Sequence, residues 1–275
     1  MIDIHSHILP KVDDGPETWA ESLELCRLMV EQGIRTVVAT PHYWPEVYEP
    51  RVGLIEQRVG QLNQLLRSRH MDLTVLGGQE LLFCPELRGL LAKRLVLTLN
   101  DSRYLLLELP QLSVREQLYE GLFQLQMAGY IPIIAHPEKN RMIQRDPGLM
   151  VELVRKGGLG QLTASSLLDS APGKVRTCAR DLVRRQAVQL MASDAHSCKG
   201  RPPRLRDGLG QAEELLKSRL DAERMVRERP EEIIQDHTLR LPEPKKDTGR
   251  KKEGVLTLLC KEVFGERFPA RAGNG

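Results

Sequence analysis

Residues 104–136, YLLLELPQLSVREQLYEGLFQLQMAGYIPIIAH, contain a complete strand–helix–strand unit. The apolar runs 104–109 and 131–136 are short and nearly continuous, as in strands that are buried on both faces. Between them, residues 113–129 carry apolar side chains at helical spacing and end at a glycine, which commonly stops a helix. Two buried strands joined by a helix indicate neighbouring strands of a parallel sheet. Each run ends in a polar side chain, a glutamate in the first and a histidine in the second.

The same alternation recurs along most of the chain. Seven strands are predicted, at residues 2–5, 34–40, 73–79, 104–109, 131–136, 159–164 and 188–193. Further helices are predicted at 17–33 and 51–69, each with apolar residues three and four apart. Seven such units indicate an α/β fold with a closed or nearly closed (β/α) barrel. A doubly wound open sheet is the structural alternative.

The composition is that of an ordinary globular protein. Of 275 residues, 41% are hydrophobic and 28% are charged, with a net charge of +3. The balanced charge and an aromatic content of 4% argue against nucleic-acid binding. No apolar run has the length of a membrane span, no secretory signal pattern is present, and the five cysteines form no CxxC motif. We therefore expect a cytoplasmic protein without stable membrane insertion.

The character of the sequence changes near residue 240. The stretch LPEPKKDTGRKKEG (241–254) is polar and basic, which is typical of a linker. Residues 255–268 have the pattern of a short amphipathic helix, which would dock on its own domain, bind a partner or form an oligomer. We predict a barrel domain over residues 1–238 and a basic linker with an amphipathic tail over residues 239–275.

Metal-ligand side chains stand at the carboxyl ends of the predicted strands. In a parallel barrel these ends open on one face, where active sites are built. Six of the seven strands end in histidine, aspartate or glutamate, and the loop after the first adds one aspartate. The nine candidate ligands are His5, His7, Asp14, His42, Glu80, Glu108, His136, Asp194 and His196. The strand at 159–164 contributes only Gln161 and Thr163.

Nine such side chains in one cleft predict bound metal ions. A single histidine at a strand end is more often a packing residue, but crowded imidazoles and carboxylates are costly without cations. Mixed nitrogen and oxygen ligands without thiolates suit manganese, iron or zinc better than magnesium alone. At three or four protein ligands per ion, the set predicts two or three divalent ions. Clustered ions of this kind generate hydroxide at neutral pH and neutralise phosphoryl charge.

The motifs DIHSHILPKVDDG, TPH, LLLELP, AHPEKNR and SDAH with RPP resemble those of the PHP (polymerase and histidinol phosphatase) superfamily. They are most similar to the CpsB/CapC-like bacterial tyrosine phosphatases, and the resemblance covers roughly residues 1–235. It implies a distorted (β/α)7 TIM-like barrel and a site for three ions, commonly manganese. It also implies a phosphotyrosine protein substrate, such as the tail of a tyrosine autokinase that regulates capsule or exopolysaccharide synthesis.

The resemblance also implies how the nine ligands divide among three ions, with one glutamate shared by the first two. The implied sets are His5, His7, Glu80 and Asp194; Glu80, Glu108 and His136; and Asp14, His42 and His196. Asp13 is expected to support a ligand or the loop rather than to bind an ion.

The family's phosphate-binding arginines are only partly matched. Arg201 of GRPP matches one of them, but the residue after HPE is Lys139 where the family usually has arginine. Lysine binds phosphate as a point charge without the bidentate fork. Either Lys139 takes this role or Arg141, two residues on, takes part. These three cations are the candidate catalytic residues.

Several alternatives stay open at the level of sequence. The same metal cluster would serve a histidinol-phosphate phosphatase or a nuclease-type phosphoesterase, and a degenerate barrel would only dock phosphotyrosine. Aromatic residues in the loop 43–50 would line a substrate pocket or pack the loop down. CKGRPPR (198–204) has the Cys-x5-Arg spacing of thiol phosphatases, but Pro202 and Pro203 lack the N–H groups that such a loop needs.

Overall fold

The computed structural model describes residues 1–111, 114–241 and 243–244. The predicted tail helix at 255–268 lies outside the described residues. The strands are β1 Ile2–Ser6, β2 Thr36–Ala39, β3 His42–Tyr43, β4 Thr74–Gly77, β5 Glu80–Leu82, β6 Tyr104–Glu108, β7 Ile131–Ala135, β8 Leu159–Thr163 and β9 Leu190–Ala192. The α-helices are α1 Trp19–Glu31, α2 Val52–Ser68, α3 Leu87–Ala92, α4 Arg115–Met127, α5 Arg141–Arg145, α6 Gly148–Arg155, α7 Gly173–Arg184, α8 Leu205–Leu216, α9 Arg219–Arg224 and α10 Glu228–Ile234. Three 3₁₀ turns are η1 Leu99–Asp101, η2 Pro137–Lys139 and η3 Ala164–Leu167.

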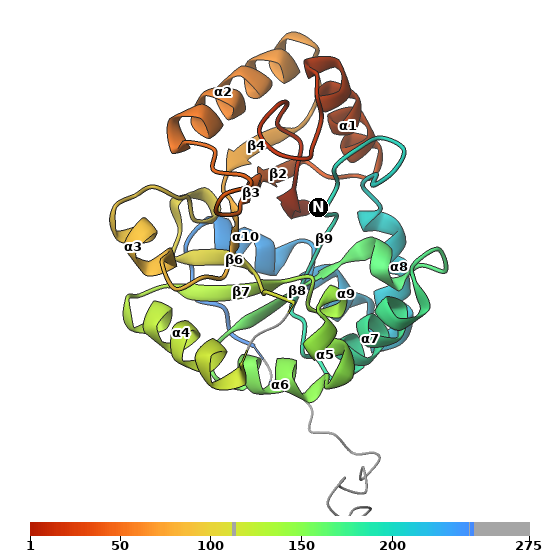
Figure 1. The fold of residues 1–275 in the computed structure, drawn as a ribbon. Coiled ribbons are helices and arrows are strands. Elements are labelled where there is room, and N and C mark those ends of the chain that lie inside the picture. Colours follow the sequence, from red (N-terminus) through yellow and green to blue (C-terminus); the bar gives the residue numbers. More distant parts are fainter. Residues whose placement is uncertain (112–113, 242, 245–275) are drawn as a thin grey trace, which may run out of the picture. The chain divides into compact units, whose positions relative to one another are not determined.

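The strands form a parallel barrel with helices on the outside (Figure 1). One sheet has the order β1-β2-β4 and the other the order β3-β5-β6-β7-β8-β9, and every pairing is parallel. The two sheets meet where β1 lies beside β9, through a bridge between Ser6 and Ala195. The N–H of His7 donates to the carbonyl of Ala195 at 2.8 Å. The predicted α/β barrel is therefore confirmed.

The strands predicted at 34–40 and 73–79 are confirmed as β2 and β4, but each is followed by a further short strand, β3 or β5, that was not predicted. After β2 the chain bends at Pro41, which has no N–H for a ladder, and continues as β3 in the other sheet. After β4 it bends at Gly78 and continues as β5. A Cβ on Gly78 would lie 2.9 Å from Cγ1 of Val38, so the bend after β4 packs closely on β2. These breaks distort the barrel but keep seven strand positions around it.

Alternate strand residues fill the inside of the barrel. The inner cluster includes Ile4, Val38, Tyr104, Leu106, Ile133, Ala135, Leu190 and Ala192. Leu99 of η1 and Ile233 of α10 join it at the amino ends of the strands, where the hydroxyl of Tyr104 donates to the carbonyl of His237 at 2.6 Å. Since β6 alternates inward at Tyr104 and Leu106, its last residue, Glu108, faces the opposite, open mouth.

The predicted helices at 17–33, 51–69 and 113–129 are confirmed as α1, α2 and α4. Thr18 and Glu21 form a capping box at the start of α1, and the chain turns out of that helix at Gly33, with φ of 83°. Leu239 and Leu241 lie just past the predicted domain boundary at residue 238, and both pack against the inner cluster. The boundary itself stays a prediction. Within the described residues, none of the helices is both long and apolar enough to cross a bilayer.

Candidate metal centre

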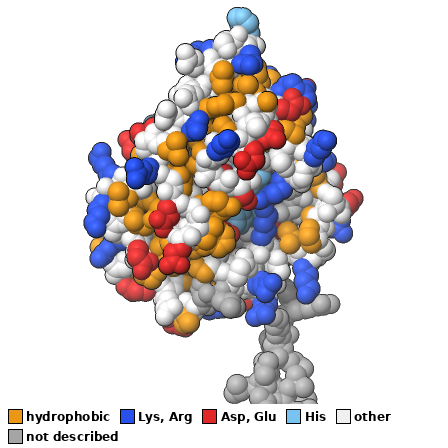
Figure 2. Space-filling view, turned by 45° about the horizontal axis from the view of Figure 1, so that its top comes forward, with side chains coloured by type: hydrophobic (Ala, Val, Ile, Leu, Met, Phe, Trp, Pro, Cys, Tyr) orange, Lys and Arg blue, Asp and Glu red, His pale blue; other side chains and the backbone are white. Residues whose placement is uncertain are grey.

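All nine predicted ligands lie together at the carboxyl ends of the strands. Figure 2 shows histidine at the bottom of a hollow in this face, with basic side chains beside it. Seven of the nine predicted ligands form three overlapping groups, and within each group the ligand atoms all lie within 4.8 Å of one another. The groups are His7, Asp14, His42 and His196; His5, His7 and Glu80; and His42, Glu80 and Glu108. The other two predicted ligands border these groups, with His136 Nε2 2.8 Å from Glu80 Oε1 and Asp194 Oδ1 3.5 Å from His5 Nε2.

The carboxylate of Glu80 is the centre of the cluster. It is fully buried, and the imidazole nitrogens of four histidines lie 2.8–3.3 Å from its oxygens. Neither oxygen accepts a hydrogen bond of proper geometry from any described residue. A buried carboxylate left in this state is expensive. The arrangement fits a carboxylate whose true partners are cations.

The rings of His5 and His7 are both oriented by partners behind them. Nδ1 of His5 lies 2.7 Å from Oε1 of Gln161, and Nδ1 of His7 lies 2.6 Å from Oδ2 of Asp13. With Nδ1 donating in each ring, the two Nε2 atoms present lone pairs to each other across 3.1 Å. Two lone pairs cannot face each other at this distance unless a proton or a metal ion lies between them. The donor set therefore fits divalent ions.

The charges of the cluster agree with this geometry. Burial alone would lower the pKa of His7, but Asp13 and Glu80 outweigh it and raise that pKa to about 10. Burial would raise the pKa of Glu80, yet the imidazoles of His5 and His136 hold it well below the usual range. Burial and the neighbouring Glu80 charge raise the pKa of Glu108. The cluster therefore draws in positive charge, which a divalent ion supplies better than protons.

Asp194 connects the cluster to two of the three candidate catalytic cations. Its Oδ1 accepts a hydrogen bond from Arg201 at 2.8 Å, and its Oδ2 accepts one from Lys139. Burial would raise the pKa of Asp194, but Lys139 and the nearby imidazoles hold it well below its usual range. Arg141 is placed differently, since it lines a groove between α5 and α7, and among the described residues its side chain makes no hydrogen bond or ion pair with the cluster. The structure thus brings Arg201 and Lys139, but not Arg141, to the candidate centre.

Two strand ends that carry ligands are bent by unusual backbone conformations. His136 has φ of 31° and Asp194 has φ of 53°, the left-handed region that non-glycine residues rarely adopt. Each residue follows directly or closely on a buried strand, β7 or β9. Such strain persists only where the surrounding structure enforces it, and it gathers at functional sites.

Sequence reasoning missed several buried polar residues that support the cluster. Gln161 was expected only to be polar, but it holds the ring of His5. Asp3 accepts from the N–H of Ser193 at 3.0 Å, which ties β1 to the strand end that carries Asp194. Glu138 accepts from the N–H of Thr163 at 3.1 Å and anchors the turn η2 from within. The signal for them was the presence of polar residues inside otherwise apolar strands and turns. Asp13, expected to support a ligand, contacts His7 as described above.

Aromatic residues of the loop 43–50 lie beside the cluster. The ring of Tyr48 stacks on His42, with 5.9 Å between centroids and 19° between planes. Trp44 meets the edge of His42 at 6.3 Å and is 39% exposed. The backbone of Trp44 and Tyr48 pairs as an antiparallel bridge, which holds the loop in shape. An exposed aromatic surface therefore borders the candidate centre.

Cys198 has no feature of a thiolate nucleophile. Burial raises the pKa of its thiol, and the neighbouring charges of Glu24 and Glu21 raise it further. Its sulfur faces the carbonyl of Glu21 at 3.8 Å. A catalytic thiol needs a lowered pKa in positive surroundings, so the Cys-x5-Arg spacing carries no phosphate loop here.

Comparison with known proteins decides the family. Residues 1–235 match the family described as "Capsular polysaccharide synthesis, CpsB/CapC". The chain belongs to this family. It is 39% identical to tyrosine-protein phosphatase YwqE of Bacillus subtilis strain 168 over 239 residues, which is 87% of this chain and 93% of that protein. It is 30% identical to tyrosine-protein phosphatase CpsB of Streptococcus pneumoniae over 249 residues, which is 87% of this chain and all of that protein.

The family also has a closely similar solved structure. It comes from work on YwqE of Bacillus subtilis and CpsB of Streptococcus pneumoniae, described as unique metal-dependent tyrosine phosphatases. The TM-score is 0.85 at 38% identity, over 90% of this chain and 100% of that chain. The resemblance seen in the sequence and the predicted barrel are both confirmed.

Proposed function

We propose that this chain is a metal-dependent protein-tyrosine phosphatase whose substrate is a phosphotyrosine-containing protein. The observation that carries the proposal is the meeting of four imidazoles on the buried carboxylate of Glu80, neither oxygen of which is hydrogen-bonded. A buried carboxylate without hydrogen bonds is stabilised by bound cations. The reaction class is supported by family members that are named tyrosine-protein phosphatases.

The nine ligands would hold two or three divalent ions. Nitrogen and oxygen donors in this ratio favour manganese, with iron and zinc as alternatives. The proposed sets remain His5, His7, Glu80 and Asp194; Glu80, Glu108 and His136; and Asp14, His42 and His196. His7 and His42 each belong to two of the spatial groups described above, so they border two of these sets. Glu80 is the shared ligand.

The basic side chains at the mouth would bind the phosphoryl group. When bound, clustered divalent ions supply a nucleophile at neutral pH and neutralise phosphoryl charge. Arg201 and Lys139 reach the cluster from its rim and are 45% and 33% exposed, so an entering phosphate can take their N–H groups. Asp194 holds both cations in place and keeps their heads directed inward. Of the two candidates after HPE, Lys139 is the one we assign to this role.

The tyrosine phenolate is a leaving group that suits the residues at this site. Tyrosine has a pKa of ~10, so its phenolate leaves with little help from a general acid. The described residues at the mouth offer Tyr48 and Trp44 as an aromatic wall beside His42, against which a phosphotyrosine ring can pack. A serine phosphate would lack this contact and would ask for more protonation of the leaving oxygen.

Two alternatives are less well supported. A histidinol-phosphate phosphatase or another PHP phosphoesterase would use the same cluster, but the relatives reported above are tyrosine-protein phosphatases. A non-catalytic barrel that docks phosphotyrosine would not need a complete ligand set, and such sets decay when they are unused.

The cellular role is inferred from the family. The link to capsular polysaccharide synthesis favours the phosphotyrosine tail of a bacterial tyrosine kinase as the substrate, in a cytoplasmic setting. The four cysteines among the described residues are free thiols, which agrees with a reducing compartment.

The deciding experiment compares substrates and metal content in one preparation. We expect at least about two equivalents of metal per chain, from the ligand count, and loss of activity on chelation that manganese restores. A phosphotyrosine peptide should be hydrolysed faster than histidinol phosphate. The reverse preference would exclude the substrate class, full activity of the metal-free protein would exclude the metal centre, and bound metal without any turnover would favour the docking barrel.

A further inference from the structure

We infer that a basic groove beside the metal centre binds a second phosphotyrosine on the same substrate segment. This inference rests on the proposed function and adds to it a preference for multiply phosphorylated substrates. The groove lies between α5 and α7, and we call it the α5–α7 groove. Its lining includes Arg141, Gln144, Arg145, Lys174, Cys178 and Arg184.

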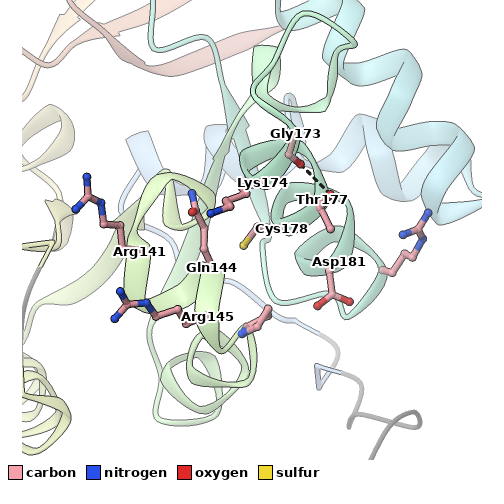
Figure 3. Close-up of a pocket in the computed structure, with 10 residues that line it drawn as sticks. Arg141, Gln144, Arg145, Gly173, Lys174, Thr177, Cys178 and Asp181 are labelled. Carbon is pink, nitrogen blue, oxygen red and sulfur yellow. Dashed lines mark hydrogen bonds between the residues drawn. The ribbon is translucent and has the colours of Figure 1, made fainter. Parts of the chain in front are cut away.

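The groove has the size and form of a binding site. Its volume is about 920 Å³, and it is open to solvent along its length. Figure 3 shows Lys174 and Cys178 of α7 directed toward Gln144 of α5, while the long side chains of Arg141 and Arg145 extend from α5 away from α7. Cys178 is buried at its base, and Pro147 also lines it. These two residues offer an apolar base for an aromatic ring.

The lining of the groove carries a net positive charge, with four cations against one acid. Four cations line it: Arg141, Arg145, Lys174 and Arg184. All four are exposed, and across the described part of the chain no ion pair or hydrogen bond engages any of their side chains. The single acid of the lining, Asp181, binds Arg185 at 2.8 Å. Gathered cations repel one another unless an anion lies among them, and phosphate is the anion that arginine binds best.

Two arginines next to the groove are engaged in ion pairs, unlike the cations that line it. Arg115 donates to Asp146 at 2.6 Å, and Arg176 donates to Asp169 at 2.8 Å. Helix α7 adds to the positive potential, because it begins at Gly173 without a side-chain cap on its first N–H groups. The groove therefore gathers cations without ion pairs next to two arginines that are paired.

The groove and the metal centre are joined by one short, rigid segment. Lys139 of η2 turns inward to Asp194, and Arg141 begins α5 and lines the groove. Their Cα atoms are two residues apart, which limits the distance between them to ~7 Å. Between them, the side chain of Asn140 caps α5 and donates to the carbonyl of Pro110 at 3.0 Å. The turn η2 itself packs against α7.

This geometry selects the kind of substrate. An extended peptide advances ~3.3 Å per residue, so phosphotyrosines a few residues apart can occupy the centre and the groove together. A second aryl phosphate would place its ring on Cys178 and Pro147 and its phosphate beside Lys174, where the exposed, long side chains of Arg141 and Arg145 can turn to meet it. An acidic side chain such as glutamate has neither the ring nor the second charge, and it should bind more weakly.

The test uses three peptides of one sequence, with a phosphotyrosine at the cleaved position. The second position, a few residues away, carries phosphotyrosine, tyrosine or glutamate. For the intact protein we expect the doubly phosphorylated peptide to have a KM about tenfold below that of the singly phosphorylated one, since a charged hydrogen bond is worth ~1.5–3 kcal/mol. Two equivalent cleavage sites alone would give only a statistical factor of about two in kcat/KM.

Matched variants assign the effect to the groove. The double variant Arg145→Gln with Lys174→Gln should remove the preference and leave p-nitrophenyl phosphate turnover unchanged. The control double variant Arg67→Gln with Arg69→Gln, at the exposed end of α2, removes the same two charges far from the groove and should keep the preference. Equal loss in this control would mean general charge attraction and would overturn the inference.

Other outcomes separate this inference from the proposed function. Normal hydrolysis with equal KM values for all three peptides would overturn the groove alone. Equal KM values for the glutamate and phosphotyrosine peptides would overturn the phosphotyrosine specificity. If no peptide is hydrolysed, the proposed function fails, and binding of the same peptides by fluorescence anisotropy still tests the groove.

Discussion

Oε1 of Gln161 lies 2.7 Å from Nδ1 of His5, across the barrel from β8 to β1. The Nε2 of the same amide donates to the carbonyl of Leu162 at 2.8 Å, which fixes its orientation. An amide oxygen can only accept, so Nδ1 of His5 carries the hydrogen and Nε2 presents its lone pair to Glu80. Gln161 thus sets the state in which His5 can bind an ion.

Replacing Gln161 should weaken metal binding without removing a ligand. We expect Gln161→Leu to lower metal affinity and activity by about 10–100-fold, the usual cost of losing a partner behind a ligating histidine. Metal titration of the apo protein measures this directly. Gln189→Leu is the control, because Gln189 is equally buried but binds the N–H of Gly160 instead of the cluster. Equal losses in both variants would assign the effect to folding.

Removing a proposed ligand should cost more. We expect His136→Ala to lower kcat by more than about 100-fold, beyond the range for supporting partners, because Glu80 then loses its nearest imidazole at 2.8 Å. Circular dichroism should show a retained fold. His70→Ala, at an exposed position after α2, should keep full activity. Full activity of His136→Ala would contradict its assignment as a ligand.

Lys139 should matter more than Arg141 for the chemical step. We expect Lys139→Ala to lower kcat by about 100-fold or more, the typical effect of one lost donor to a developing charge. Lys139→Arg should retain much of the activity, because arginine can replace lysine as a phosphate donor and adds a second N–H. Steady-state kinetics with p-nitrophenyl phosphate distinguishes the two positions. A larger loss for Arg141→Ala than for Lys139→Ala would reverse our assignment.

The meeting of the nine proposed ligands could be predicted from the sequence, because all but Asp14 lie at or just after the end of an apolar run. Glu108 and His136 follow runs of buried aliphatic residues, and alternation along a strand then directs them to the mouth. The division of these side chains among ions came from the family resemblance and not from residue spacing. In the structure both His42 and His136 lie beside Glu80, at 3.1 Å and 2.8 Å, so the spatial groups and the implied sets overlap without coinciding. Such groupings depend on ring rotations, which no spacing rule contains.

Supporting contacts and strand breaks escaped prediction for related reasons. Gln161 lies within LGQLTA, where its side chain gives no sign of the histidine 156 residues away that it contacts. Pro41 and Gly78 lie next to apolar runs that look continuous, and only the strand pairings show that the chain changes sheets there. Contacts of this kind are long-range, and they follow from the barrel rather than from local preference.

The close packing at Gly78 leads to a prediction about stability. A Cβ at this position would lie 2.9 Å from Cγ1 of Val38 and 3.1 Å from Cδ2 of Leu99, and both neighbours belong to the buried inner cluster. We expect Gly78→Ala to lower the free energy of unfolding by about 1–3 kcal/mol, the usual cost of overpacking. Gly53→Ala is the control, since nothing lies within 4 Å of a Cβ there and alanine favours the helix by ~0.5–1 kcal/mol. Urea unfolding at fixed metal concentration compares the two variants. If Gly78→Ala were as stable as Gly53→Ala, the bend between β4 and β5 would have to accommodate a methyl group, and the close packing of Gly78 on Val38 and Leu99 would not restrict this position.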